Sequence, residues 1–102
     1  MAAIEITSEN FEQEVLHSDK PVLLDFWAVW CGPCMMLSPL VEEVADEHPE
    51  IKVGKVNTDE QMALAQKFKV AAIPALFVVK DGEIVNKSVG AIPKEQIEAL
   101  IK

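Results

Sequence analysis

The sequence predicts an α/β fold in which a mixed β-sheet carries helices on both faces. Strand-like apolar segments alternate with helical segments over much of the chain, and this alternation favours parallel pairing of the strands. Near the end, Asp81-Gly82 separates two apolar segments, as in a two-residue hairpin between antiparallel strands. The expected order of elements is β-α-β-α-β-α-β-β-α.

The first elements are a short strand, a helix and a central strand. Residues 2–6 suit the short strand, and Thr7 or Ser8 can cap a helix that runs to Leu16. The segment 22–29 is almost continuously apolar, which is the pattern of a strand buried on both faces of a sheet. This segment is therefore expected at the centre of the sheet.

A long helix follows the central strand. It is expected to start at Cys31 and to end near His48, with a kink at Pro39, because proline cannot donate a backbone hydrogen bond. The next elements are a strand at 51–56, where apolar residues alternate with lysines, and a helix within 60–68.

The last elements are a hairpin and a terminal helix. Strands are expected at 75–79 and 84–89, and Pro93 suits the start of the final helix. A chain of 102 residues, half of them hydrophobic, is large enough for one core and too short for two.

Charge and hydropathy exclude several classes of partner. Nine basic and seventeen acidic residues give a net charge of -8, which repels nucleic acid and anionic membranes. The apolar segments are shorter than the roughly 20 residues that a transmembrane helix needs, and the N-terminal residues lack the pattern of a secretory signal. We therefore expect a cytoplasmic protein that binds neither nucleic acid nor membrane.

The two cysteines of the chain stand together in Cys31-Gly32-Pro33-Cys34. If Cys31 opens a helix, Cys34 lies one turn further on the same face, and the sulfurs can bond or separate with little backbone movement. A helix N-terminus favours a thiolate, since its free N–H groups and its dipole stabilise negative charge. Cys31 is therefore the candidate nucleophile, and Cys34 is the more shielded partner.

Two other uses of the cysteine pair stay open from the residues alone. A structural disulfide is one, although such a small ring removes little entropy from the unfolded chain. A metal site is the other, with His17 or His48 as additional ligands, although neither histidine has the paired spacing of a zinc finger. We expect no metal.

The segment Asp25-Phe26-Trp27-Ala28-Val29-Trp30-Cys31-Gly32-Pro33-Cys34 strongly resembles the thioredoxin family, and the likeness extends over the full chain. The resemblance implies a single thioredoxin domain over 1–102, with a central mixed five-stranded sheet flanked by four helices. Further matches are Pro39, Lys55-Val56-Asn57-Thr58-Asp59, Ile73-Pro74, Lys80-Asp81-Gly82-Glu83 and Val89-Gly90-Ala91.

The activity that the resemblance implies is general reduction of protein disulfides by dithiol exchange, without a bound cofactor. Cys31 would attack the substrate disulfide, and Cys34 would resolve the mixed disulfide that forms. The implied partners are diverse oxidised proteins and a separate thioredoxin reductase, dependent on NADPH or ferredoxin. A monomer is the expected state.

Asp25 is a carboxylate within an apolar strand, where burial should raise its pKa. By the resemblance it lies beneath the cysteines, exchanges protons with Cys34 through water, and has Lys55 nearby. A residue of this kind at a strand end can instead reach solvent, and a lysine on an alternating strand can be merely exposed.

The resemblance also implies a contact surface for protein substrates around the sulfurs. It includes a cis bond at Ile73-Pro74, which turns the backbone of Ile73 toward an extended substrate segment. Trp27 is expected to pack beneath this surface, and Trp30 could instead belong to the core. The expected contact residues are Trp30, Gly32, Pro33, Ile73, Pro74, Gly90 and Ala91.

The chain departs from the family pattern beside the cysteines. Met35 and Met36 stand where a basic residue usually follows the second cysteine, and Ala75 replaces the hydroxyl residue that is common after the cis proline. Loss of positive charge affects thiolate formation and the choice of partner. Two rival functions are an oxidant or isomerase of the same fold, and a binding scaffold in which the cysteines are incidental.

Overall fold

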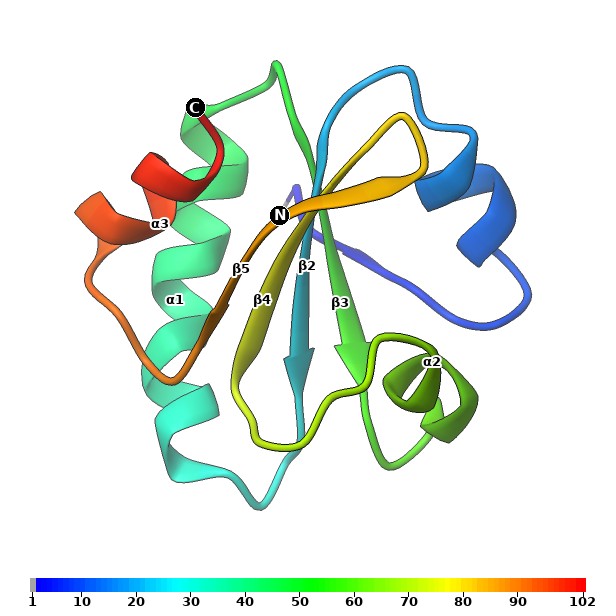
Figure 1. Ribbon diagram of the computed structural model, residues 1–102. Coiled ribbons are helices and arrows are strands. Elements are labelled where there is room, and N and C mark those ends of the chain that lie inside the picture. Colours follow the sequence, from blue (N-terminus) through cyan, green and yellow to red (C-terminus); the bar gives the residue numbers. More distant parts are fainter. Residues whose placement is uncertain (1) are drawn as a thin grey trace.

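A single five-stranded sheet organises the computed structural model, which describes residues 2–102 (Figure 1). The strand order is β1-β3-β2-β4-β5, with β1, β3 and β2 parallel and with β4 and β5 antiparallel to their neighbours. The mixed sheet predicted from the sequence is therefore confirmed. The strands are β1 (Ile4–Glu5), β2 (Val22–Trp27), β3 (Lys52–Asn57), β4 (Ala75–Lys80) and β5 (Glu83–Val89).

Four helical elements cover the two faces of the sheet. Figure 1 shows α1 and α3 on one side, with α2 and the N-terminal helical turn on the other. The longest helix described, α1, is 16 residues, and no helix in residues 2–102 has the length and apolar character to cross a membrane. The helical elements are η1 (Glu12–Leu16), α1 (Gly32–Glu47), α2 (Met62–Lys67) and α3 (Lys94–Leu100).

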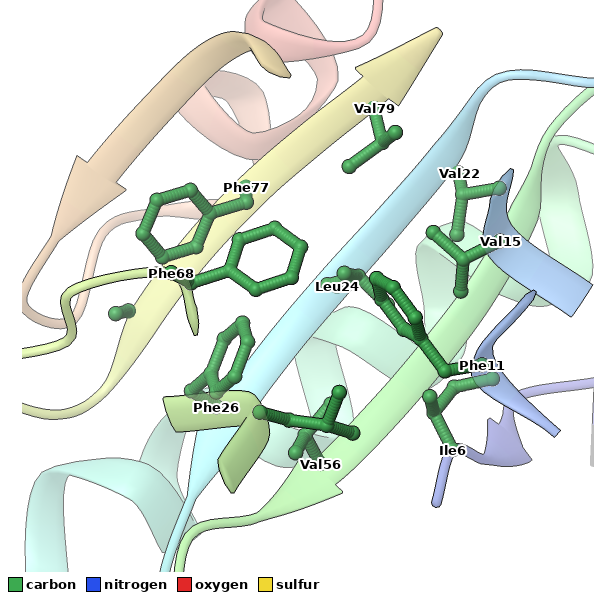
Figure 2. Close-up of a cluster of buried hydrophobic side chains, with 12 residues drawn as sticks. Ile6, Phe11, Val15, Val22, Leu24, Phe26, Val56, Phe68, Phe77 and Val79 are labelled. Carbon is green, nitrogen blue, oxygen red and sulfur yellow. The ribbon is translucent and has the colours of Figure 1, made fainter. Parts of the chain in front are cut away.

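The central strand β2 supplies side chains to both faces, as its apolar sequence predicts. Leu24 and Phe26 point to the side of α2, where the rings of Phe68 and Phe77 pack against Phe26 (Figure 2). Leu23 belongs to the cluster on the side of α1. Since side chains alternate along a strand, Asp25 also faces α1.

The first helix was expected to be an α-helix, but the structure shows a π-helix there. η1 is a π-helical turn, in which the His17 N–H donates to the Glu12 carbonyl five residues earlier, at 2.9 Å. The wider turn has a physical reason in the core, since it brings both Val15 and Leu16 onto the face that carries Phe11. The predicted cap at Thr7 or Ser8 was wrong, because the N-cap of η1 is Phe11, which makes no side-chain cap hydrogen bond. The Thr7 hydroxyl accepts from the Asn10 N–H at 3.4 Å in the turn that precedes η1.

Two strands are shorter than predicted. β1 covers only Ile4–Glu5, and β2 ends at Trp27 instead of residue 29. β2 ends there because the Trp27 carbonyl accepts from Thr58 and the Ala28 carbonyl accepts from the Cys31 N–H, which turns the chain toward α1.

The hairpin and the long helix agree with the sequence. Asp81 and Gly82 have φ of 52° and 78°, as a two-residue turn between twisted strands requires, and Lys80 pairs with Glu83. Pro39 lies inside α1, and a kink at this residue stays a prediction.

Candidate active site

The cysteine pair stands at the N-terminus of α1, as the sequence predicts. Cys31 is the N-cap residue, and its sulfur accepts a hydrogen bond from the Cys34 N–H at 3.2 Å. Pro33 occupies the first helical turn, where its missing N–H costs nothing. The structure joins the two cysteines in a disulfide.

Both sulfurs lie in a small apolar cluster with Ala28. Cys31 is 5% exposed and Cys34 is 1% exposed, so Cys31 is the more accessible, although by less than the sequence suggests. Trp27 and Ile73 pack against the same cluster. The surroundings of Cys34 offer little water, so a proton leaving this thiol needs a nearby acceptor.

Asp25 is the buried carboxyl of this site, and the alternative that it reaches solvent at a strand end is wrong. It is 1% exposed, and neither of its oxygens has a hydrogen-bond partner within residues 2–102. Burial raises the pKa of Asp25 to about 6. The Lys55 ammonium opposes this shift and the Glu42 carboxylate adds to it.

Lys55 lies opposite Asp25 on the adjacent parallel strand. Its side chain is partly buried, so the alternative that it is merely exposed is wrong. The ammonium donates to the Ser38 hydroxyl and lies 5.2 Å from the centroid of the Trp27 ring. The structure therefore brings Lys55 to the acid, as expected, but its hydrogen bond goes to Ser38.

The loop before β4 carries the cis Ile73–Pro74 bond that the resemblance implies. Ile73 packs against the cluster of cysteines. The Pro74 carbonyl accepts from the Gly90 N–H at 2.8 Å, which joins this loop to the segment after β5. Gly90 has φ of +100°, a conformation that glycine adopts readily.

The residues around the disulfide form an exposed apolar surface. Trp30 is 69% exposed, so the alternative that it belongs to the core is wrong. Its indole Nε1 donates to the Asp59 carboxylate at 2.9 Å. Gly32 has open space where a side chain would stand. The other exposed large apolar residues of this segment are Val29, Met35 and Met36.

Three residues with a place in this site were not identified from the sequence: Ser38, Glu42 and Asp59. Ser38 and Glu42 follow Cys34 at intervals of four, which puts them on one face of α1. That spacing was a usable signal for both residues. Nothing near Asp59 in the sequence points to Trp30.

The structure gives no support to a metal site at the cysteines. Among residues 2–102, the side chains close enough to share an ion are Glu47, His48 and Glu98. His48 follows the C-terminal end of α1, and a helix of 16 residues is about 24 Å long, so His48 cannot reach the sulfurs at the other end. Within this grouping His48 is hydrogen-bonded to Glu98 at 3.0 Å, and Glu47 accepts from Lys94 at 2.8 Å.

A bonded Cys-x-x-Cys pair that caps a helix, on a mixed five-stranded sheet with a buried carboxyl on its central strand, defines a dithiol–disulfide oxidoreductase. Comparison with known proteins gives the family. The family profile described as Thioredoxin matches residues 2–102.

Several relatives are similar over nearly their whole length. The thioredoxin of Porphyra purpurea is 44% identical over 102 residues, which cover 99% of this chain and 95% of that protein. Thioredoxin 1 of a Nostoc species is 47% identical with the same coverage, and the thioredoxin of Haemophilus influenzae is 43% identical over 96% of this chain and 92% of that protein. The chain belongs to the thioredoxin family, and its activity is thiol–disulfide reduction.

Proposed function

We propose that Cys31 is the nucleophile that attacks the disulfide of an oxidised protein. The observation that carries this assignment is its place as the N-cap of α1, where the Cys34 N–H already donates to its sulfur. A Cys31 thiolate in this position keeps that donor and the positive end of the helix dipole. When it attacks, a Cys31–substrate disulfide forms, and the other substrate sulfur leaves as a thiolate that takes a proton from solvent.

Cys34 then resolves the mixed disulfide. It loses its proton, attacks the Cys31 sulfur and displaces the second substrate thiolate, so the substrate gains two electrons and the protein holds a Cys31–Cys34 disulfide. Asp25 is the proposed acceptor of the Cys34 proton, because Asp25 and Cys34 are both buried and the Asp25 pKa of about 6 lies near neutrality. We propose that the Lys55 ammonium adjusts the protonation of Asp25, because its positive charge lowers the pKa of this acid.

The proposed substrate surface consists of Trp30, Gly32, Pro33, Ile73, Pro74, Gly90 and Ala91. Its support is the exposed Trp30, the open space at Gly32 and the contact of Ile73 with the cysteine cluster. A largely apolar surface with few side-chain donors suits substrates of varied sequence, which dock by shape and backbone hydrogen bonds.

The oxidised protein must be reduced again before the next turnover. We propose that a separate thioredoxin reductase, dependent on NADPH or ferredoxin, supplies the two electrons, and that the protein serves many oxidised targets in the cytoplasm. We also propose that residues 1–102 form one domain and act as a monomer without a bound cofactor. The single sheet that receives every described helix supports the one-domain proposal.

Reduction of insulin disulfides, with dithiothreitol as the electron source, tests the proposed roles of the cysteines. Cys31→Ser should reduce the rate by about three orders of magnitude or more, because the remaining thiol, Cys34, is only 1% exposed. Cys34→Ser should also be inactive in turnover, but it should accumulate a covalent complex with the substrate, visible by mass spectrometry without reductant. A complex that accumulates in Cys31→Ser instead would reverse the two roles.

Two further measurements separate the rival functions. The reduction potential distinguishes a reductant from an oxidant or isomerase of the same fold, and a strongly oxidising value would contradict our proposal. A variant with both cysteines replaced by serine tests the scaffold alternative in cells. Full biological function of that variant would support a scaffold.

A further inference from the structure

Asp25 and Lys55 are close on the sheet but are not directly paired. They are register partners on β2 and β3, and both side chains face α1. Opposite charges at such positions normally form an ion pair, above all when one of them is buried. Here neither Asp25 oxygen has a hydrogen-bond partner within residues 2–102, whereas the ammonium donates to Ser38 and lies over the Trp27 ring.

Ser38 comes from the helix that carries the resolving cysteine. Cys34, Ser38 and Glu42 are spaced by four residues and form a row on one face of α1. Glu42 has a buried carboxylate oxygen without a hydrogen-bond partner in the described chain. The ammonium of Lys55 is therefore held by a neutral hydroxyl, although both oxygens of the buried Asp25 and one buried oxygen of the half-buried Glu42 lack hydrogen-bond partners within residues 2–102.

We propose that Ser38 is a positioning residue whose hydroxyl holds the Lys55 ammonium and keeps it from pairing directly with Asp25. The proposal rests on the function proposed above for Asp25, and it deepens that function by naming the group that adjusts the acid. Ser38 touches neither substrate nor sulfur in this role; it acts through Lys55.

The physical argument is that the charge state of Asp25 depends on where the ammonium is held. The attraction between two charges increases as their separation decreases, and it is strong where water is excluded. Direct contact with the ammonium would favour the carboxylate and lower the pKa of Asp25. With the ammonium on Ser38, burial remains the largest influence on this pKa and keeps it raised.

The other groups around Asp25 do not take over the influence of Lys55 on the pKa of Asp25. On the β4 side its register partner is Leu76, and α3 contributes Ile97 to the same side of the sheet, so both of these elements present apolar groups. From α1, Glu42 raises the pKa of Asp25, and the two cysteines do not titrate in the disulfide form. The oxidised protein therefore isolates the effect of Lys55 and Glu42.

The test is a titration of the Asp25 side-chain carboxyl carbon by ¹³C NMR in the oxidised protein. Ser38→Ala removes the hydroxyl and suits a helix, whereas Ser38→Thr keeps the hydroxyl and is the matched control. We expect the midpoint for Asp25 to fall by about one pH unit in Ser38→Ala and to change little in Ser38→Thr. An unchanged midpoint in Ser38→Ala, in a protein with native chemical shifts elsewhere, would overturn the proposal.

A second background tests whether the effect passes through Lys55. Lys55→Met keeps the length of the side chain and removes its charge. In this background we expect Ser38→Ala to leave the Asp25 midpoint where Lys55→Met alone puts it. An equal fall in both backgrounds would show that Ser38 acts on Asp25 by another route, and would overturn the positioning role.

Kinetics separate this inference from the proposed function. The release of reduced substrate from a preformed mixed disulfide reports the Cys34 step, and its rate should depend on pH through Asp25. If Ser38→Ala moves the NMR midpoint but not this pH profile, Ser38 positions Lys55 as proposed, and Asp25 is not the proton acceptor. If the wild-type profile follows the Asp25 midpoint but Ser38→Ala moves neither, the role of Asp25 stands and that of Ser38 fails.

Discussion

The indole nitrogen of Trp30 donates a hydrogen bond of 2.9 Å to the carboxylate of Asp59, which lies just beyond the end of β3. Asp59 is itself ordered, because its N–H donates to the Asn57 side chain at 3.0 Å. The exposed Trp30 ring, which precedes Cys31, is therefore held in place by its hydrogen bond to Asp59 and not by burial. A fixed ring loses less conformational freedom when a substrate covers it.

Asp59→Ala should weaken substrate binding more than it slows the chemical steps. Immobilising one side chain on binding costs about 0.5–1.5 kcal/mol, which corresponds to an increase in KM of roughly two- to ten-fold. Steady-state reduction of insulin over a range of concentrations gives KM and kcat separately.

The control for this change is Asp59→Asn, whose amide oxygen can still accept from the indole. It should keep a KM close to that of the wild type. The exchange of the Trp30 indole proton with water, followed by NMR, should be faster in Asp59→Ala only. A KM unchanged in Asp59→Ala despite faster exchange would contradict a role for the fixed ring in binding.

The buried acid Asp25 should make the protein less stable as pH rises. Its pKa is 3.8 when unperturbed and about 6 in the folded protein, so the folded state binds the proton more tightly than the unfolded state does. The free energy of unfolding therefore falls between about pH 4 and pH 6, and the loss persists above pH 6. A difference of about two pH units corresponds to about 3 kcal/mol.

Asp25→Asn removes this titration and nearly preserves the shape of the side chain. At pH 8 it should increase the free energy of unfolding by about 2–3 kcal/mol, and below pH 4 the gain should disappear. Urea unfolding of the oxidised protein at several pH values measures this. Asp46→Asn, an exposed aspartate on α1, is the control. A gain of the same size at pH 3.5 and pH 8 would show that ionisation of Asp25 is not its cause.

The fold could be predicted from the sequence wherever local signals agreed with the packing. The continuous apolar run of β2, the Asp81-Gly82 turn and the Cys31 start of α1 each specify a local structure that the core then uses. The π-helical turn of η1 could not be predicted, because helix propensity does not distinguish it from an α-helix. Packing of both Val15 and Leu16 against the sheet selects it.

The site was predictable where a residue type was unusual for its place. A carboxylate in an apolar strand pointed to Asp25, whereas Pro74 was found through the family resemblance. The contacts of Trp30 with Asp59 and of Lys55 with Ser38 join residues 29 and 17 positions apart, and no local pattern encodes such pairs. The contact of His48 with Glu98 likewise joins residues 50 positions apart.

The imidazole of His48 joins the end of α1 to α3, because its two nitrogens contact Glu50 and Glu98 at 3.0 Å each. Both contacts raise the pKa of His48, with that to Glu98 the larger, and the contact with His48 lowers the pKa of Glu98 and of Glu50. We call the contacts of His48 with Glu50 and Glu98 the His48 clamp. It is strongest when the imidazole is charged and both carboxylates are ionised.

The signs of these shifts define the pH range in which the clamp stabilises the fold. The histidine contribution is complete below its unfolded pKa of 6.5 and is lost as pH rises through the raised folded value. The glutamate contributions are complete above the unfolded pKa of 4.5 and are lost as pH falls through the lowered values. His48→Ala should therefore reduce the free energy of unfolding most between about pH 4.5 and 6.5, and less at pH 9.

The matched control is His17→Ala, because His17 is highly exposed and its nearest carboxylate, Glu12, is 3.8 Å away. Water screens such a surface pair, so its removal should change stability little at any pH. Urea unfolding of the oxidised wild type and the two variants at pH 5.5 and pH 9 compares the two sites directly. A loss in His48→Ala that is equal at the two pH values would mean that the imidazole acts by packing, whereas a loss confined to pH 5.5 requires its charge.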